Sequence, residues 1–335
     1  MDTKPNLLLL QSGLPKSGNY WLYQILQQML GRAGVPQQSY ARRHPIYETA
    51  KSWPHFADQA GIDYLEINSG GYFFRKGAFV EPILDLDVYL AQCSHVWTHA
   101  YWDEQAGAAF RKFDRIVYIL RDPRDAAISA AKYVFTPFMQ EQHPGGERTS
   151  EEYLDHRFAE LIFAWVQHVG GYLLRQEEYG IYVIFYERLL ADLEGELQAL
   201  LAYLGVSLPP EEITAIQDAV TFTTMKQKSP HHVRKGQAGG WVDALSPAQK
   251  AQAQKIAGSL MALLGYPLAE GQVGKLPELS APLDAQQIIE AMRLSRGGWQ
   301  DKLAYGAAFL RSRRPLGEKL QKGMQFLLGR GRWQA

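Results

Sequence analysis

The stretch that decides the fold is LLLLQSGLPKSGNYWLYQILQQMLG, which occupies residues 7–31. Its four leucines predict a buried strand, and a turn rich in glycine, proline and serine follows at residues 13–18. Apolar residues then recur at helical spacing as far as Leu30, and Gly31 stands where helices commonly end. A strand, a glycine turn and a helix N-terminus in this order predict an anion site, because backbone N–H groups and the helix dipole direct positive charge into the turn.

The turn differs from the phosphate loop of Mg²⁺-dependent kinases. Gly13 and Gly18 have the spacing of that loop, but Asn19 and Tyr20 stand where it has Lys and Ser or Thr. Lys16 instead lies inside the turn, from where its ammonium can reach a phosphate or a leaving oxygen. An ATP-dependent P-loop kinase remains an alternative interpretation. Such a kinase would need Mg²⁺ and would not use a 3′-phosphate.

Length, charge and cysteine content bound the class of protein. The 335 residues are 46% hydrophobic, which is enough for the core of one large α/β domain or of two domains. The 35 basic and 35 acidic side chains cancel, which argues against nucleic acid as the main partner. Cys93 is the only cysteine, which favours a reducing compartment. With no signal peptide and no apolar run of the roughly 18 residues that a membrane span needs, we expect a cytoplasmic protein.

A second cationic turn follows the strand predicted at residues 115–120. Arg121-Asp-Pro-Arg-Asp125 comes directly after that strand, and a predicted helix that carries Ser129 comes next. Open α/β sheets bind ligands at the carboxyl ends of their strands, where a guanidinium and a helical hydroxyl can hold a phosphate. These residues therefore predict a phosphate site. The alternative is a surface ion-pair cluster of the two arginines with Asp122 and Asp125.

A histidine ends the strand predicted at residues 94–99. His99 is a candidate general base, because an imidazole with the ordinary pKa of about 6.5 can accept a hydroxyl proton near neutral pH. His95 lies on the same face of the strand and is a rival candidate. For both histidines the alternative is a hydrogen-bonded residue of the core.

The sequence PKSG at residues 15–18, followed by Trp21, resembles the 5′-phosphosulfate loop of sulfotransferases that use 3′-phosphoadenosine-5′-phosphosulfate (PAPS). The resemblance is to the cytosolic type, in which the loop backbone holds the 5′-phosphate. It implies an α/β fold with three α/β/α layers and a central, mostly parallel sheet, similar to the P-loop nucleotide kinases. Asn19 and Tyr20 replace the two threonines that the family usually has before the tryptophan.

The spacing of the next motifs resembles the same family. Arg121 and Ser129 stand eight residues apart, like the Arg and Ser that hold the 3′-phosphate in the family. His99 precedes Arg121 by 22 residues, which is the family's distance between its general base and that arginine. The resemblance therefore implies that His99 removes the acceptor proton. Trp97 occupies a position at which the family often has a lysine.

Three later segments also resemble family motifs. Tyr186 precedes a glutamate, like the family's tyrosine on the adenine side of the nucleotide. Thr221 and Phe222 match a segment whose phenylalanine stacks on adenine, and RKG at residues 234–236 matches a loop that folds over the 3′-phosphate. Gly240 replaces the family's usual aspartate in this loop, and the dimerisation segment that normally follows is not recognisable.

Together these motifs imply a sulfotransferase that moves the sulfuryl group of PAPS to a hydroxyl of a small, apolar or lipid-like acceptor. The products would be 3′-phosphoadenosine-5′-phosphate (PAP) and a sulfate ester, and no metal is expected. Lys16 and His99 are implied as the catalytic residues. A non-catalytic nucleotide- or membrane-binding adaptor of the same fold is a further alternative. The implied nucleotide-binding residues are Pro15, Lys16, Ser17, Gly18, Asn19, Tyr20, Trp21, Arg121, Ser129, Tyr186, Thr221, Phe222, Arg234, Lys235 and Gly236.

The resemblance covers residues 7–266, so we expect a sulfotransferase domain at residues 1–268 and a linker with a basic helical extension at 269–335. Residues 290–335 contain ten Lys or Arg and three Asp or Glu. A stripe at helical spacing predicts an amphipathic helix there. This helix would lie on an anionic membrane surface, or pack on the catalytic domain or on a second subunit of a homo-oligomer. The stripe consists of Leu316, Leu320, Met324 and Leu327.

Overall fold

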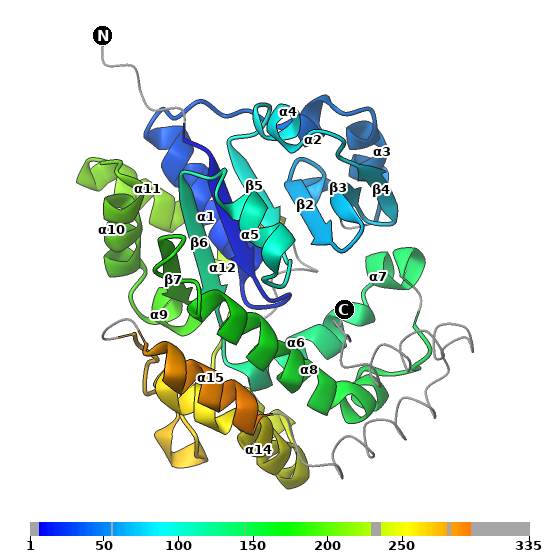
Figure 1. The fold of residues 1–335 in the computed structure, drawn as a ribbon, viewed down its shortest axis with the longest axis vertical. Coiled ribbons are helices and arrows are strands. Elements are labelled where there is room, and N and C mark those ends of the chain that lie inside the picture. Colours follow the sequence, from blue (N-terminus) through cyan, green and yellow to red (C-terminus); the bar gives the residue numbers. More distant parts are fainter. Residues whose placement is uncertain (1–6, 55, 144, 229–235, 280–282, 296–335) are drawn as a thin grey trace.

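The computed structural model describes residues 7–54, 56–143, 145–228, 236–279 and 283–295. Within these residues helices lie on both faces of a seven-stranded sheet, which confirms the predicted α/β fold with a mostly parallel sheet (Figure 1). The strand order is β4-β3-β2-β5-β1-β6-β7. The strands are β1 (Leu9–Gly13), β2 (Asp63–Asn68), β3 (Gly71–Lys76), β4 (Phe79–Pro82), β5 (His95–Thr98), β6 (Arg115–Leu120) and β7 (Ile181–Phe185).

Several helices begin at residues whose side chains cap them. Asp103 accepts a hydrogen bond from the backbone N–H of Ala106 at the start of α5, and Ser246 forms a capping box with Gln249 at the start of α14. The α-helices are α1 (Asn19–Arg32), α2 (Tyr40–Arg43), α3 (Ile46–Ser52), α4 (Leu86–Leu90), α5 (Glu104–Phe110), α6 (Pro123–Val134), α7 (Pro137–Gln142), α8 (Ser150–Leu173), α9 (Tyr186–Ala191), α10 (Leu193–Leu204), α11 (Pro210–Ala219), α12 (Phe222–Lys228), α13 (Trp241–Ala244), α14 (Pro247–Leu263) and α15 (Ala285–Leu294). Short 3₁₀ helices are η1 (Ala57–Gln59) and η2 (Glu270–Gln272).

Parallel pairing brings three strand ends together at one edge of the sheet. β1 lies between β5 and β6 and pairs in parallel with both, with Ser12 opposite Thr98 and Gly13 opposite Ile119. β2 is parallel to β5 and β7 is parallel to β6, whereas β3 and β4 continue the sheet as antiparallel strands. The turns that follow β1, β5 and β6 therefore leave the sheet side by side.

The two faces of the sheet bury separate parts of the core. Along β6, Val117 and Ile119 belong to one apolar cluster and Ile116 and Tyr118 to another, because successive side chains of a strand point to opposite faces. Helices α1, α10 and α11 contribute buried residues to the first cluster. Helices α5, α6, α8 and α14 contribute to the second. The sheet is thus covered on both sides, as a mostly parallel sheet requires.

The first part of the predicted C-terminal extension packs on the rest of the molecule. Ile288 and Ala291 of α15 are buried in the same cluster as the apolar face of α8 (Figure 1). A Cβ added to Gly170 of α8 would lie 2.3 Å from the sulfur of Met292, so the two helices touch closely there. The predicted boundary at residue 268 stays a prediction, and the stripe at residues 316–327 lies outside the described residues.

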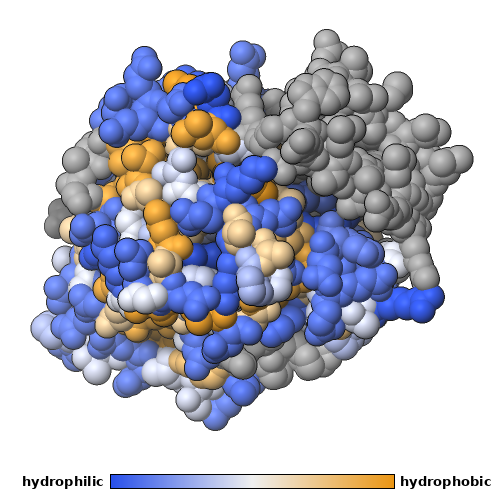
Figure 2. All heavy atoms as spheres, turned by 90° about the horizontal axis from the view of Figure 1, so that it is seen from below, coloured by the Kyte–Doolittle hydropathy of each residue, from blue (hydrophilic) through white to orange (hydrophobic). Residues whose placement is uncertain are grey.

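The surface on the side of α14 and α15 is mixed in character. Figure 2 shows small apolar patches that hydrophilic side chains separate on this face. The large apolar side chains that are exposed in this part of the chain include Val273, Leu276, Ile289 and Leu294. Among the described residues, no helix combines the length and the apolar character that crossing a bilayer requires.

Candidate active site

A cavity of about 770 Å³ opens where the turns after β1, β5 and β6 leave the sheet. Thirteen of the sequence-predicted residues line it. Ser17 does not line it and is buried beneath the loop, and Arg234 and Lys235 lie outside the described residues. The lining residues among those predicted are Pro15, Lys16, Gly18, Asn19, Tyr20, Trp21, His99, Arg121, Ser129, Tyr186, Thr221, Phe222 and Gly236.

The loop after β1 is a tight turn with left-handed backbone at two positions. Lys16 has φ 72° and Gly18 has φ 99°. The left-handed region is costly for Lys16, which has a Cβ, and is the region that glycine adopts readily. A Cβ on Gly18 would lie 2.5 Å from the ring of Tyr186. The loop and the ring of Tyr186 therefore approach so closely that position 18 has room only for a glycine.

Asn19 holds this loop closed. Its side-chain NH₂ donates to the backbone carbonyl oxygen of Leu14 at 2.8 Å. Its backbone carbonyl oxygen accepts from the side-chain NH₂ of Gln11 at 2.7 Å. The side chain is buried. Asn19 therefore braces the loop at the start of α1, which is a different role from the hydroxyl contacts of the threonine that the resemblance would place here.

His99 lines the cavity, and a hydrogen bond fixes which of its ring nitrogens carries the hydrogen. Its Nδ1 lies 2.5 Å from the carbonyl oxygen of Gly13. A carbonyl can only accept, so Nδ1 carries the hydrogen and Nε2 keeps a lone pair. Burial lowers the pKa of His99 to about 4, and the charge of Lys16 acts in the same direction. The ring is therefore neutral at pH 7 and can accept a proton at Nε2.

His95, the rival base, lies away from the cavity. Its Nδ1 is 2.9 Å from the side-chain nitrogen of Gln27 on α1, and its ring stacks on Tyr23. Burial lowers the pKa of His95 to about 3. It is therefore a residue of the core, and of these two histidines His99 alone lines the cavity.

Two residues beside His99 were not predicted to act there. The ring of Trp97 meets the imidazole of His99 edge-on at 5.4 Å and lines the cavity. His168 of α8 is buried, and its Nε2 lies 3.3 Å from the backbone oxygen of His99. No sequence motif identifies His168, because it stands at no motif spacing from the other residues of the site.

The ammonium of Lys16 lies over an aromatic ring that also lines the cavity. Its Nζ is 3.8 Å from the ring centre of Tyr133, which is a cation–π distance. Tyr133 belongs to α6, one turn beyond Ser129. The loop cation and the predicted phosphate-binding helix are therefore in direct contact.

Arg121 connects two loops across the cavity. Its guanidinium donates to the carbonyl oxygen of Lys16 at 3.2 Å and to that of Gln237 at 3.1 Å. It also lies over the ring of Tyr186, 4.3 Å from its centre. The Nε–H of Arg121 is buried and has no hydrogen-bond partner among the described residues. A donor in this state can be satisfied by an anionic ligand.

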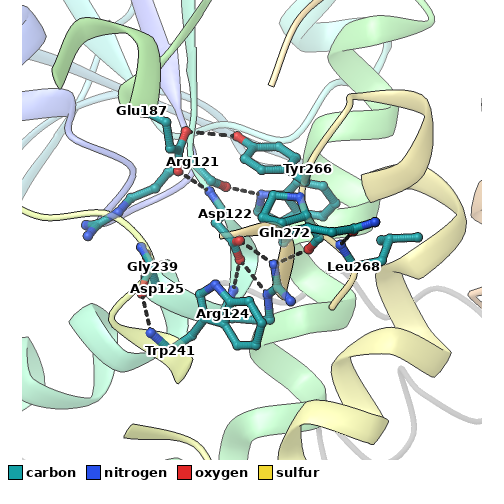
Figure 3. A network of polar contacts seen from close by, with 12 residues as sticks. Arg121, Asp122, Arg124, Asp125, Glu187, Gly239, Trp241, Tyr266, Leu268 and Gln272 are labelled. Atoms are coloured by element: carbon teal, nitrogen blue, oxygen red, sulfur yellow. Dashed lines mark hydrogen bonds and ion pairs between the residues drawn. The ribbon is translucent and has the colours of Figure 1, made fainter. Parts of the chain in front are cut away.

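The other charges of the 121–125 segment form a buried network and not the surface cluster considered as an alternative (Figure 3). Arg124 makes two hydrogen bonds to the carboxylate of Asp122, and both residues are 3% exposed. The same guanidinium donates to the carbonyl of Pro267 and lies 3.5 Å from the ring centre of Trp241. Arg124 therefore joins α6 to two later segments and does not face the cavity.

Glu187 closes this network from the end of β7. Its carboxylate accepts from the backbone N–H of Asp122 at 2.9 Å and from the hydroxyl of Tyr266 at 3.3 Å (Figure 3). Burial raises the pKa of Glu187 to about 7. The residue is structural, because it positions the turn that carries Arg121 and does not line the cavity.

Aromatic and apolar side chains around Tyr186 line a further part of the cavity. Trp21 meets Tyr186 edge-on at 5.7 Å, and its indole N–H donates to the carbonyl of Val220 at 2.9 Å. Phe222 is 36% exposed, and a Cβ on Gly236 would lie 2.5 Å from its ring. Apolar residues of α9 and α10 complete this part, and the sequence motifs did not include them: Leu189, Leu190 and Leu193.

Within the described residues, no group of three or more His, Cys, Asp or Glu side chains is placed to hold a metal ion. The charged groups that face the cavity include Lys16, Arg121, Lys132, Asp125 and Asp243. The geometry thus offers cations, a neutral imidazole and a stacking surface in one cavity, which suits an anionic ligand with an aromatic base.

Comparison with known proteins gives the family. A family model of the sulfotransferase domain matches residues 8–265. A 3-alpha-hydroxysteroid sulfotransferase of Cavia porcellus is 26% identical over 269 residues, which cover 76% of this chain and 82% of that protein. A 3-beta-hydroxysteroid sulfotransferase of the same species is 25% identical over 272 residues, with the same shares covered.

Solved structures share the fold. A mouse sulfotransferase complexed with PAP superposes with a TM-score of 0.51 at 18% identity, over 77% of this chain and 84% of that one. A retinol dehydratase in complex with androsterone and the inactive cofactor PAP gives the same TM-score and identity, over 74% of this chain and 78% of the other.

The family match spans the sheet, both cationic turns and the cavity, and it decides against the P-loop kinase. The chain belongs to the sulfotransferase family, and it is a PAPS-dependent transferase.

Proposed function

We propose that the enzyme transfers the sulfuryl group to a hydroxyl of a small apolar molecule, with His99 as the general base. The observation that supports this most directly is the hydrogen bond between Nδ1 of His99 and the carbonyl of Gly13. It directs the lone pair of Nε2 away from the backbone. His99 lines the cavity beside Lys16, where a base and a cation are needed together.

The residues present fit the nucleotide. Gly18 brings no side chain into the loop, because the ring of Tyr186 occupies the place where a Cβ would stand, and Arg121 has a buried N–H without a partner among the described residues. We infer that the loop amides at residues 16–19 hold the 5′-phosphate, and that Arg121 and Ser129 hold the 3′-phosphate. Trp21 and Phe222 would enclose the adenine. Bound in this way, PAPS would supply an electrophilic sulfuryl group with a phosphate as its leaving group.

Each catalytic side chain has a separate task. His99 would accept the hydroxyl proton of the acceptor at Nε2, with the Gly13 carbonyl holding the ring in place. Lys16 would stabilise negative charge on the oxygens of the transferred and leaving groups. The backbone of the loop positions Lys16, which has the left-handed φ that the turn requires at this place. Catalysis would then consist mostly of positioning and electrostatics.

The acceptor side of the cavity favours an apolar molecule. Trp97 and Tyr20 pack in one cluster next to His99, and both line the cavity. Aromatic rings around one polar catalytic group are typical of pockets for small apolar ligands. The names of the similar proteins point the same way, since two are hydroxysteroid sulfotransferases and one was solved with androsterone.

We also propose a cytoplasmic location, which the single buried thiol of Cys93 supports. Membrane contact through the tail and assembly into a homo-oligomer stay predictions from the sequence, because residues 296–335 lie outside the described part of the chain.

The decisive test is turnover with PAPS and a panel of simple acceptors, such as 4-nitrophenol and a hydroxysteroid. His99→Ala should lower kcat by about 10²–10⁴, the usual contribution of a general base, while PAP affinity stays nearly unchanged. The control is His95→Gln, which changes a histidine of the same segment outside the cavity and should keep turnover.

Two results would contradict the proposal. If His99→Ala keeps turnover and His95→Gln loses it, the base has been misassigned. If the wild type binds PAP but transfers sulfate to no acceptor of the panel, the acceptor is not a small apolar hydroxyl compound of this kind.

A further inference from the structure

Asp125 contacts the wall of the cavity in an unusual way. Its two carboxylate oxygens accept hydrogen bonds from the backbone N–H groups of Gly239 and Trp241, at 2.7 and 2.9 Å (Figure 3). The side chain is 5% exposed. Gln237 and Gly240, which belong to the same turn, line the cavity. A carboxylate in the first turn of α6 therefore holds a turn that lies more than a hundred residues later in the chain.

A carboxylate is a costly group at this place. Burial raises the pKa of Asp125, and the nearby charge of Asp122 raises it further, whereas Arg121 and the two backbone amides act in the opposite direction. A negative charge beside a site for phosphate also repels the ligand. The hydrogen bonds from the N–H groups of Gly239 and Trp241 offset this cost. The carboxylate therefore serves to hold the turn in position.

The same turn is held a second time, by the residue that faces the nucleotide. Arg121 donates to the carbonyl oxygen of Gln237, two residues before Gly239. Asp125 and Arg121, which lie four residues apart, thus bind the same turn: Asp125 through two of its backbone N–H groups and Arg121 through a backbone carbonyl. Displacement of the turn would remove one of the contacts that orient the guanidinium of Arg121.

We propose that Asp125 is a positioning residue that secures the 237–241 turn and, through the Gln237 carbonyl, holds Arg121 in the orientation that recognises a 3′-phosphate. The inference rests on the assignment of the 3′-phosphate to Arg121. Asp125 would therefore set the preference of the site for a nucleotide with a 3′-phosphate through the turn that it holds.

The test is calorimetric titration of Asp125→Asn with PAP and with AMP, which lacks the 3′-phosphate. Asn has the same shape, but one of its two polar atoms is a donor and cannot accept from a backbone N–H. We expect PAP affinity to fall by about tenfold or more, equivalent to roughly 1.4 kcal/mol, and AMP affinity to stay nearly constant. The control is Asp85→Asn. Asp85 also accepts from two backbone amides, those of Asp87 and Val88, but lies away from the cavity.

A second measurement needs no variant. Because coupling between two sites is reciprocal, PAP should protect the turn that Asp125 holds. Hydrogen exchange at the amides of Gly239 and Trp241 in the wild type should slow on addition of PAP, and less on addition of AMP.

The outcomes separate the inference from the function on which it rests. Equal affinity of the wild type for PAP and AMP would refute the 3′-phosphate site itself, and the inference with it. If the wild type prefers PAP and Asp125→Asn keeps that preference, or loses both ligands equally, Asp125 is a structural residue only. Unchanged exchange at the turn on PAP binding would overturn the inference in the same way, even if Asp125→Asn fails to fold.

Discussion

Gly18 is the residue at which the loop conformation and the cavity wall depend on each other. Its φ of 99° is one that L-residues rarely adopt, and the ring of Tyr186 fills the place where a Cβ would stand. The replacement Gly18→Ala would therefore have to move either the loop or the ring. Because both line the cavity, ligand affinity and stability should decrease together.

We predict that Gly18→Ala lowers the free energy of unfolding by at least about 1–2 kcal/mol, the cost of left-handed backbone for a residue with a Cβ. It should also weaken PAP binding. The matched control is Gly31→Ala in α1, where a Cβ meets no atom within 4 Å and should stabilise the helix by roughly 0.5–1 kcal/mol. Urea unfolding and calorimetry measure both quantities. Similar effects at the two glycines would show that the close approach to Tyr186 is unimportant.

At the scale of an element, α15 shows whether the predicted extension belongs to the folded domain. Its neighbouring residues Ile288 and Ile289 differ in environment. Ile288 is 1% exposed and packs in the core with α8, whereas Ile289 is 53% exposed. The two isoleucines thus form an internal comparison of identical side chains on one helix.

We predict that Ile288→Ala destabilises the protein by about 2–5 kcal/mol, the range for truncating a buried isoleucine. Ile289→Ala should cost less than about 0.5 kcal/mol, as is usual for an exposed position. Urea unfolding of both variants gives the values. A small effect of Ile288→Ala would mean that α15 detaches without loss of the core, as the predicted boundary at residue 268 would imply.

For the whole molecule, buried histidines determine how stability depends on pH. Burial lowers the pKa of His95 and His168 to about 3 and that of His99 to about 4. In the unfolded chain the ordinary value is about 6.5. Between these values the unfolded chain binds more protons at the histidines than the folded one, so their contribution to the free energy of unfolding rises with pH and becomes level above about pH 6.5.

Two buried carboxyl groups act in the opposite direction. Burial raises the pKa of Asp63 to about 6 and that of Glu187 to about 7. The contribution of these two groups to the free energy of unfolding therefore falls as the pH rises and they ionise. Three histidines with larger shifts outweigh them. We predict lower stability at pH 4.5 than at pH 7 in urea unfolding, with proton uptake on unfolding. Equal or greater stability at pH 4.5 would show that the histidines are not buried as neutral rings.

The sequence by itself determined the fold class, the family and thirteen of the residues that line the cavity. These follow from local patterns: an apolar strand, a glycine turn and a helix at residues 7–31, and an arginine eight residues before Ser129. Such patterns predict well because the turns that follow parallel strands all lie at the same end of the sheet, where open α/β sheets bind their ligands. The loop at Gly18 and the position of His99 are consequences of that arrangement.

The family spacing favoured His99 over His95 and Arg121 over Arg124, but only the tertiary structure shows where each of these side chains lies. Each pair has the same chemistry and nearly the same place in the chain, but one member lines the cavity and the other is buried. The contact of Asp125 with the turn at Gly239 joins residues 114 positions apart. Hydrogen bonds and burial at such separations depend on how the layers pack, and no local pattern encodes which side of a strand or helix a distant segment will cover.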